Sequence, residues 1–325
     1  MRYSIGVDVG GTNIVCGVMD ESGVVLEKMK CPTDAHLGLD TVLSLIVDMV
    51  NTLRQQFVNT GELVGMGLGI PGLVDPKKGV IVSAGHLQWF NVPVAELLRK
   101  RTGLPVYIDN DVRMYMYGEA VAGAGRGYSH ILGITIGTGI SAAMINDEKL
   151  FYGYKAMSGE IGHVQMEGVS EKCVCGLSAC LETVASASGM VAQAKKAIAT
   201  GRSTILTEWF PGETINQLTA AHISKALDTG DTLANEIITR AGKWIGQALA
   251  SVVTVLSPEV IIVGGGGALA GERIMSPLRQ ELNKLLLSDY SDGLHIVLAE
   301  HNEDAGIIGS SIHARQQLER IHDQS

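Results

Sequence analysis

Apolar residues in this chain follow two patterns, short and nearly unbroken runs or longer stretches with helical spacing. The short runs are bounded by glycine-containing turns and are typical of strands. Helical spacing is clearest in residues 39–58, where Val42, Ile46 and Val50 fall on one face. In the first part of the chain, the predicted strands are 5–8, 14–19, 24–30, 64–70 and 106–108, and the predicted helices are 39–58, 92–101 and 112–122.

A strand–loop–strand unit occurs twice along the chain. The first copy surrounds residues 10–13, and the second surrounds residues 137–139 after a glycine-rich hinge at 123–127. Two copies of one unit indicate two related lobes, each contributing a hairpin tip to a shared cleft. In the second part of the chain, the predicted strands are 131–136, 140–145, 260–263 and 294–299, and the predicted helices are 185–199, 220–228, 232–256 and 305–320.

Length and composition agree with a two-lobed globular protein. A chain of 325 residues exceeds what one core usually serves, and 46% hydrophobic with 18% charged residues is typical of compact proteins. A net charge of −9 and an isoelectric point near 5.5 argue against nucleic acid as a partner. No apolar run is long enough to cross a membrane, and the first strand begins too early for a signal peptide. We therefore expect a cytoplasmic protein without a membrane partner.

Three of the five cysteines lie close together in the sequence, with a histidine shortly before them. His163, Cys173, Cys175 and Cys180 supply one imidazole and three thiols, which can close a tetrahedral shell around one Zn²⁺. All four positions are then filled by protein, so the site is interpreted as structural. The alternative is a set of scattered buried thiols, which rarely gather around a glycine turn.

Forty glycines gather in tight clusters rather than at a fixed period. Glycines at a hairpin tip allow backbone N–H groups to approach an anion closely, and an aspartate before them can hold Mg²⁺ beside phosphates. A glycine hairpin without any ligand is the alternative for each loop alone. Three such loops favour a nucleoside triphosphate, and their residues are Asp8, Gly10, Gly11, Thr12 and Asn13 in the first, Thr138 in the second, and Gly264, Gly265 and Gly266 in the third.

Carboxylates and amides at two further places are candidates for chemistry on a hydroxylated substrate. Asn110 and Asp111 follow a buried strand and open a helix, so they are either helix caps or, for Asp111, a general base that takes a hydroxyl proton. Glu160, His163 and Glu182 flank the predicted zinc site and suit hydrogen bonds to several sugar hydroxyls. For the two glutamates, a solvated charged loop is the alternative.

Taken together, these motifs resemble the ROK family of sugar kinases and sugar-responsive repressors, in the actin–hexokinase–Hsp70 superfamily. The resemblance runs from Ile5 to Ala314, and its most specific part is Gly159–His163 with the Cys173–Glu182 segment. It implies a two-lobed α/β fold of the actin-like ATPase (ribonuclease H-like) type, with ATP and a hexose in the cleft. It also implies phosphoryl transfer to a sugar hydroxyl, usually on carbon six, with Asp111 as base. The implied sugar contacts are Asn110, Glu160, His163, Glu182, Gly72 and His86, and the implied ATP contacts are Gly10 to Thr12, Thr138 and the 264–267 turn.

The resemblance also implies an organisation into domains and subunits. The expected small N-terminal lobe comprises residues 1–118 and is completed by the C-terminal helix 305–325. The expected large lobe comprises residues 119–304 and carries the zinc loop. A homodimer is implied as well.

Three departures from the family pattern affect the expected sugar site. An asparagine that usually contacts the sugar is replaced by Gly85, the usual Asn-Asp-Ala-Asn ends in Val112-Arg113, and a run of glycines is replaced by residues 141–143. None removes the base or the zinc ligands. The identity of the sugar stays open among glucose, allose, mannose, fructose and an N-acetylated amino sugar.

Two other functions compete with the kinase interpretation. A sugar-responsive transcriptional regulator of the family carries a winged-helix segment before the first hairpin, whereas here that hairpin begins at residue 8. A catalytically inactive sugar sensor is disfavoured because Asp8, Asp111 and Thr138 are all present. The expected function is therefore an ATP-dependent hexokinase of glucokinase type.

Overall fold

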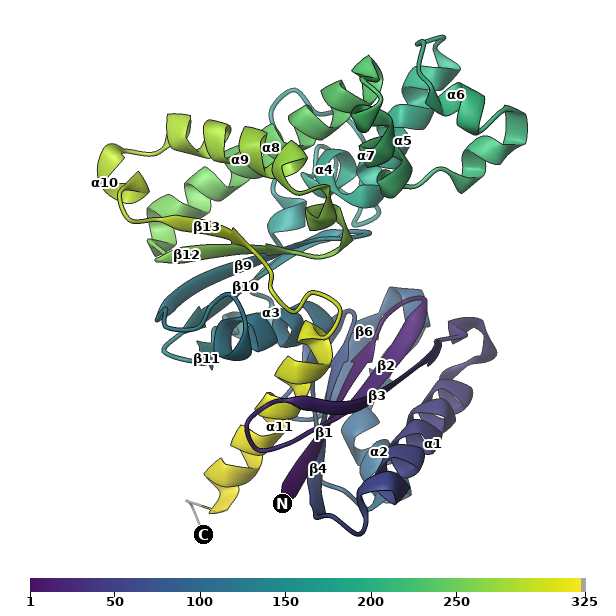
Figure 1. The fold of residues 1–325 in the computed structure, drawn as a ribbon, viewed down its shortest axis with the longest axis vertical. Coiled ribbons are helices and arrows are strands. Elements are labelled where there is room, and N and C mark those ends of the chain that lie inside the picture. Colours follow the sequence, from purple (N-terminus) through teal and green to yellow (C-terminus); the bar gives the residue numbers. More distant parts are fainter. Residues whose placement is uncertain (323–325) are drawn as a thin grey trace. The chain divides into compact units, whose positions relative to one another are not determined.

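The computed structural model describes residues 1–322 and divides them into two compact units (Figure 1). Unit 1 consists of three separate stretches of chain, and unit 2 consists of two. The domain limits expected from the sequence, at 118/119 and 304/305, stay a prediction about folding domains, because the units are defined by packing alone. Unit 1 comprises Met1–Ser129, Ile145–Ser158 and the chain from Glu300, and unit 2 comprises His130–Met144 and Gly159–Ala299.

A five-stranded sheet with the order β3-β2-β1-β4-β8 is the centre of unit 1. Its first three strands form an antiparallel meander, and β4 and β8 join β1 in parallel. Parallel strands end at the same edge of a sheet, so the carboxyl ends of β1, β4 and β8 lie together. The strands are β1 (Arg2–Val9), β2 (Asn13–Met19), β3 (Val25–Pro32), β4 (Glu62–Ile70) and β8 (Val106–Asn110).

Side chains alternate between the two faces of this sheet. Ile5 and Val7 belong to the apolar core that also contains the buried faces of α1 (Leu39–Phe57) and α2 (Val94–Thr102). The intervening Gly6 faces the C-terminal helix α11 (Ala305–His322), where a side chain would meet the backbone oxygen of Ile307 at 1.8 Å. The helix α3 (Asp111–Ala122) packs against α11, which is drawn in yellow in Figure 1. Because the backbone of α11 lies so close to β1, only glycine, which has no side chain, fits at position 6.

A second five-stranded sheet with the order β11-β10-β9-β12-β13 is the centre of unit 2, although β11 and the last two residues of β10 belong to unit 1. The strands β9, β12 and β13 are parallel neighbours, so their carboxyl ends also share one edge. A large apolar core covers the sheet, with the long helix α8 packed against α9. The elements are β9 (His130–Ile136), β10 (Ile140–Asn146), β11 (Lys149–Leu150), β12 (Val260–Gly264), β13 (His295–Leu298), α4 (Glu182–Ala185), α5 (Ala187–Ala199), α7 (Ala220–Asp228), α8 (Thr232–Leu256) and α9 (Glu272–Leu285).

Several elements were not expected from the sequence. A small antiparallel sheet, β5-β6-β7, lies between β4 and α2 in the chain, and its strands are too short to show a pattern. Helix α9 contains Pro277, which is usually a sign that a helix ends. Among the described residues, no helix has the length and apolar character that crossing a membrane requires. The additional elements are β5 (Leu73–Asp75), β6 (Val80–Ala84), β7 (Trp89–Val92), α6 (Leu206–Trp209), α10 (Ser288–Ser291) and six short 3₁₀ helices, η1 (Ala35–Leu37), η2 (Gly85–Leu87), η3 (Tyr154–Ala156), η4 (Ile161–His163), η5 (Gly212–Gln217) and η6 (Gly266–Ala270).

Candidate functional site

The first glycine loop is a tight hairpin between β1 and β2. The N–H of Gly10 donates to the carbonyl oxygen of Asn13 at 2.9 Å, and the hydroxyl of Thr33 donates to the carbonyl oxygen of Gly10 at 2.6 Å. Gly11 and Thr12 lie at the tip, and no atom lies within 4 Å of the position a Gly11 side chain would take. Hydrogen bonds thus fix the base of the turn, while the tip at Gly11 and Thr12 has free space around it. This arrangement suits an anion bound by backbone N–H groups.

Asp8 and Asp111 lie close together at the carboxyl edge of the first sheet. The strand register pairs Asp8 with Gly69 and Asn110 with Ile70, so the three strand ends meet. Burial raises the pKa of Asp111 to about 6. Burial together with the charge of Asp111 raises the pKa of Asp8 to about 7. Two neighbouring carboxyl groups, one of which disfavours ionisation of the other, fit a divalent cation beside a proton acceptor.

The sequence left open whether Asn110 and Asp111 are helix caps or whether Asp111 is a general base, and the structure assigns the cap to Asn110. The side-chain oxygen of Asn110 accepts from the N–H of Arg113 at 3.2 Å, so Asn110 is the N-cap of α3. Its amide nitrogen donates to the carbonyl oxygen of Gly72 at 3.1 Å and to Asp111 Oδ1 at 3.0 Å. Gly72 has a φ of 105°, and a side chain there would approach the Ser83 carbonyl oxygen to 2.2 Å. Asp111 is therefore not needed as the cap, and its carboxylate is oriented by Asn110.

Sequence reasoning missed a buried polar network behind Asp111. Asp109 is fully buried and accepts from the Asn110 N–H at 2.7 Å, from Arg113 Nη1 at 3.0 Å and from the Tyr152 hydroxyl at 2.8 Å. Arg113 also donates to the carbonyl oxygen of Ala156. The one signal in the sequence was that Arg113 replaces the family's asparagine, whereas the burial that makes this arginine require an anion is seen only in the structure.

The substituted position Gly85 lies in η2, next to His86. A side chain at Gly85 would have open space, with nothing within 4 Å. His86 is exposed, and the described residues provide it with no hydrogen bond that would turn it toward Asn110. The space left by the missing asparagine is therefore unfilled by protein in this structure.

The other two glycine loops abut each other in unit 2. The strands β9 and β12 are parallel with Gly264 opposite Thr135, so their carboxyl ends coincide. A side chain at Gly265 would come within 2.7 Å of the carbonyl oxygen of Ile136, the residue before the Gly137 turn. Thr138 is exposed, and its carbonyl oxygen accepts from the hydroxyl of Ser188 at 2.5 Å. The structure thus brings Thr138 together with Gly264, Gly265 and Gly266.

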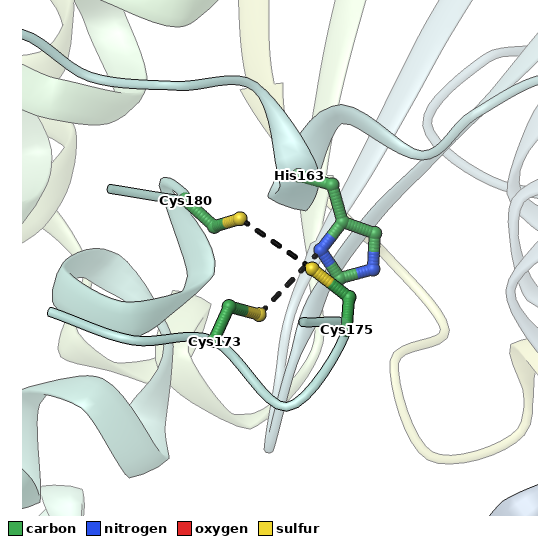
Figure 2. A group of neighbouring side chains, drawn as sticks. All are labelled: His163, Cys173, Cys175 and Cys180. Atoms are coloured by element: carbon green, nitrogen blue, oxygen red, sulfur yellow. Dashed lines mark hydrogen bonds between the residues drawn. The ribbon is translucent and has the colours of Figure 1, made fainter. Parts of the chain in front are cut away.

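The histidine and the three cysteines form one cluster in unit 2, and their side chains converge in Figure 2. All four ligand atoms lie within 4.8 Å of one another. His163 Nδ1 is 3.7 Å from Cys173 Sγ, and the sulfurs of Cys175 and Cys180 are also 3.7 Å apart. With Zn–S near 2.3 Å and Zn–N near 2.0 Å, tetrahedral ligand atoms lie roughly 3.5–3.8 Å apart, so the cluster fits such a metal.

The thiols provide a further test of this fit. Burial raises the pKa of Cys180 to about 12 and also raises the pKa of Cys173. The backbone hydrogen bond from Leu177 instead lowers the pKa of Cys175, so this thiol gives up its proton more readily. A bound cation would stabilise all three thiolates directly. The donor set and its protonation chemistry both suit a metal ion.

Two glutamates connect the metal cluster to neighbouring loops. Glu160 is exposed, and its Oε2 lies 3.8 Å from His163 Nε2, the ring nitrogen directed away from Cys173. Glu182 is half-buried, and its Oε2 accepts from the Ile140 N–H at 3.1 Å while Oε1 lies 4.0 Å from Cys173 Sγ. Glu182 therefore bridges the cysteine segment and the loop that contains Thr138.

The residues expected in the site thus form two groups, each within one unit. In unit 1 the edge of the first sheet collects Asp8, Gly72, Asn110 and Asp111 near the hairpin at 10–13. In unit 2 the metal cluster, Glu160 and Glu182 adjoin the loops at Thr138 and Gly264–Gly266.

Comparison with known proteins extends over nearly the whole chain. The ROK family profile matches residues 4–317. A glucokinase from Halalkalibacterium halodurans is 33% identical over 319 residues, which are 97% of this chain and 96% of the relative. A ROK family glucokinase from Streptomyces griseus, solved in complex with glucose and AMPPNP, superposes with a TM-score of 0.83 at 29% identity and covers 97% of this chain and 99% of its own.

Regulators of the same family are also similar. The xylose repressor of Caldicellulosiruptor bescii is 26% identical over 306 residues, and the match covers 94% of this chain but 76% of the repressor. The fold is the two-lobed actin-like ATPase fold of the ROK sugar kinases. The chain belongs to the ROK family.

Proposed function

We propose that this protein is a sugar kinase that transfers the γ-phosphoryl group of ATP to a hexose hydroxyl, the one on carbon six. The observation that carries the proposal is the pair Asp8 and Asp111 at one sheet edge, with Asp111 oriented by Asn110 and its pKa raised to about 6 by burial. A carboxylate with that pKa is ionised at neutral pH yet basic enough to take a hydroxyl proton. The glucokinase relatives support this activity.

In the proposed reaction, Asp111 is the proton acceptor. The sugar hydroxyl gives its proton to Asp111, its oxygen forms a bond to the γ-phosphorus, and the bond between that phosphorus and the β,γ-bridging oxygen breaks, so ADP leaves. Asn110 holds the Asp111 carboxylate through its amide and contributes a sugar contact, as do Gly72 and His86. A general base contributes roughly 10²–10⁴-fold to the rate. The remaining rate enhancement must come from positioning of the substrates and from stabilisation of charge in the transition state.

The glycine-rich loops are the residues that we assign to the nucleotide. The open hairpin tip at Gly10, Gly11, Thr12 and Asn13 offers backbone N–H groups to phosphates, and Thr138 with Gly264–Gly266 offers a second such surface. Asp8 is the residue placed to hold Mg²⁺, which when bound neutralises charge on the transferred phosphate. The similarity to a glucokinase that binds AMPPNP supports this assignment.

Zinc is the metal we propose for the cluster of His163, Cys173, Cys175 and Cys180. When bound it supplies a rigid cross-link, because four protein ligands leave no position for a reacting water. The cross-link would hold Glu160, His163 and Glu182 as hydrogen-bond partners of the sugar. The near-tetrahedral spacing of the ligand atoms supports zinc.

A sugar-responsive regulator is the second candidate function, since repressors share the fold. The glucokinase relative is 33% identical to this chain and the repressor 26%, and the candidate base Asp111 is present with Asp8 beside it. The kinase proposal is therefore the stronger one. We further propose a cytoplasmic homodimer with no nucleic-acid or membrane partner, on the acidic composition and on family resemblance.

One assay tests the kinase proposal. Release of ADP is measured with ATP, Mg²⁺ and each of glucose, allose, mannose, fructose and N-acetylmannosamine, and sugar-dependent turnover is expected for at least one. Asp111→Asn serves as the control for a contaminating kinase. Sugar binding without any sugar-dependent turnover across the panel would favour the regulator.

A further inference from the structure

Unit 1 contains a polar cavity of about 410 Å³ that the proposed reaction does not use. It lies beside α3, the β10–β11 turn and α11, all of which contribute residues to its wall. Its volume falls in the range of about 300–1,000 Å³ that is typical of small-molecule sites. The lining residues are Tyr117, Glu148, Lys149, Leu150, Tyr152, His313, Gln316, Gln317 and Arg320.

The wall of the cavity is held in place by internal hydrogen bonds. Tyr117 donates to Gln316 at 2.5 Å and also lies 3.1 Å from the carbonyl oxygen of Glu148. That carbonyl belongs to a tight turn in which Asp147 and Glu148 both have positive φ, 46° and 57°. A turn of this kind fixes the register of the hairpin and the position of Lys149 after it.

His313 contributes an imidazole to the wall of the cavity. Its side chain lines the cavity but is only 7% exposed, and within the described part of the chain its ring has no hydrogen-bond partner. It contacts the Tyr117 ring edge-on, with centroids 6.2 Å apart. Burial lowers the pKa of His313, so near neutral pH it is uncharged and offers one donor and one acceptor. Its ring nitrogens are therefore available to pair with a ligand hydroxyl or oxygen in the cavity.

The charged residues of the lining favour an anion. Lys149 and Arg320 bring two positive charges, against one negative charge from Glu148. Neither cation forms an ion pair with another residue that the structure describes. Gln316 and Gln317 add amide groups that suit hydroxyls. The chemistry that fits is a small phosphate ester carrying hydroxyl groups, with the phosphate on the cations.

One wall residue connects the cavity to the proposed base. The hydroxyl of Tyr152 donates to Asp109 Oδ2 at 2.8 Å, and Asp109 in turn accepts the N–H of Asn110, which orients Asp111. Burial and the charge of Asp109 raise the pKa of Tyr152, so the phenol keeps its proton and stays a donor. A ligand oxygen that competes for this proton would remove one of the three donors that hold Asp109.

We propose that this cavity is an effector site for a small hydroxylated phosphate ester, and that occupancy lowers turnover through Tyr152 and Asp109. The binding claim rests on the cavity alone, whereas the kinetic claim rests on the proposed kinase function. The reaction's own hexose phosphate and other cellular phosphate esters share this chemistry, so the experiment separates them.

Binding is measured first, by calorimetry on the full-length protein without ATP or sugar. Glucose 6-phosphate, glycerol 3-phosphate and inorganic phosphate are titrated into wild type, into Lys149→Ala/Arg320→Ala and into Arg240→Ala/Lys243→Ala, a control with the same charge change on exposed residues of α8. We expect at least a tenfold weaker affinity for one or more esters in the cavity variant and no change in the control. Absence of binding to wild type, or equal affinities in all three proteins, overturns the proposal.

Kinetics then test the coupling. With the ester that binds, kcat is expected to fall at saturating sugar and ATP, and Tyr152→Phe is expected to keep the binding but lose the inhibition. Inhibition that is purely competitive with the sugar and unchanged in the cavity variant assigns the effect to the active site and overturns the coupling. A protein that binds the ester but turns over no sugar would refute the kinase function and leave the binding site standing.

Discussion

Asp111 combines two opposed properties, because burial that makes it a better base also makes its charge costly. Its pKa is raised from 3.8 to about 6, so the folded protein binds this proton more tightly than the unfolded chain. Stability contributed by this group is therefore present at low pH and is lost as the pH rises from about 4 through about 6. A residue placed for chemistry rather than for stability is expected to behave in this way.

Asp111→Asn is accordingly expected to lose activity and gain stability. The amide keeps the shape and the contact with Asn110 but cannot take the proton, so kcat should fall roughly 10²–10⁴-fold. The midpoint of thermal unfolding should rise at pH 7 and change much less at pH 4, where the wild-type carboxyl is protonated. Near-native kcat in this variant would assign the base elsewhere, with Asp109 tested next.

Arg113 opposes the effect of burial on Asp111, since its positive charge lowers the pKa of Asp111. Arg113 also forms an ion pair with the buried Asp109. Arg113→Asn, the residue usual in the family, should move the acid limb of the kcat/KM profile to higher pH because Asp111 loses a nearby cation. It should also cost about 3–5 kcal/mol of unfolding free energy, since a buried carboxylate is left without its partner.

Arg113→Lys is the matched variant for this prediction. It keeps the positive charge but not the two-pronged contact to Asp109 and Ala156, so the acid limb should stay in place while stability falls in part. An unchanged pH profile in Arg113→Asn would show that the charge of this arginine does not act on the base.

At the scale of elements, the cysteine segment and the Thr138 loop are joined by Glu182. Cys175→Ser is expected to lower the bound zinc and, because Glu182 then loses its fixed position, to raise KM for both sugar and ATP. Metal analysis of chelator-washed protein gives the stoichiometry, and Cys31→Ser, outside the cluster, is the control. Less than about half an equivalent of zinc in well-folded, active wild type would contradict the assignment.

The short helix η2 has a bearing on sugar choice. Gly85 has open space where a side chain would project, so Gly85→Asn should be accommodated and should restore a hydrogen bond worth roughly 0.5–1.5 kcal/mol on one side of the sugar. We expect the ratio of kcat/KM for glucose over allose and mannose to rise roughly 2–13-fold. Gly85→Ala, which adds bulk without a polar group, should leave this ratio unchanged. A wild type that already prefers glucose tenfold would contradict the specificity argument.

Elements with a strong apolar period could be predicted, and those shaped by contacts could not. The helices 220–228 and 232–256 are confirmed to the residue as α7 and α8, because their apolar stripes and capping residues are explicit in the sequence. By contrast, α9 contains Pro277 and β5–β7 are too short for a period to show. In the candidate site, residues with recognisable chemistry, such as Asp111 and the cysteines, could be predicted from the sequence. The hydrogen bond from Tyr152 to Asp109 could not, because these residues are far apart in the chain and only folding brings them together. Partners distant in sequence carry no local signal.

At the scale of the whole molecule, the two units differ in how the chain builds them. Unit 2 is nearly continuous, whereas unit 1 is completed by α11, the last helix described. The fit of α11 leaves no space for side chains: at Gly67 one would meet the Ser310 carbonyl oxygen at 1.9 Å, and at Gly118 the Ala305 carbonyl oxygen at 2.2 Å. The hydroxyl of Ser310 donates to the carbonyl oxygen of Val7 in β1, and the hydroxyls of Ser311 and Ser4 share a hydrogen bond, which adds to this contact.

This dependence on α11 has a consequence for how the protein is made. During synthesis the strands of unit 1 leave the ribosome first, but the helix that covers their glycine-lined face leaves last, after all of unit 2 has been translated. At a synthesis rate of about 5–20 residues per second, this face stays covered only in part, by α3, for roughly 10–40 seconds. The small residues on that face present little apolar surface to other chains, so we expect the glycines that admit α11 also to limit aggregation of the unfinished protein.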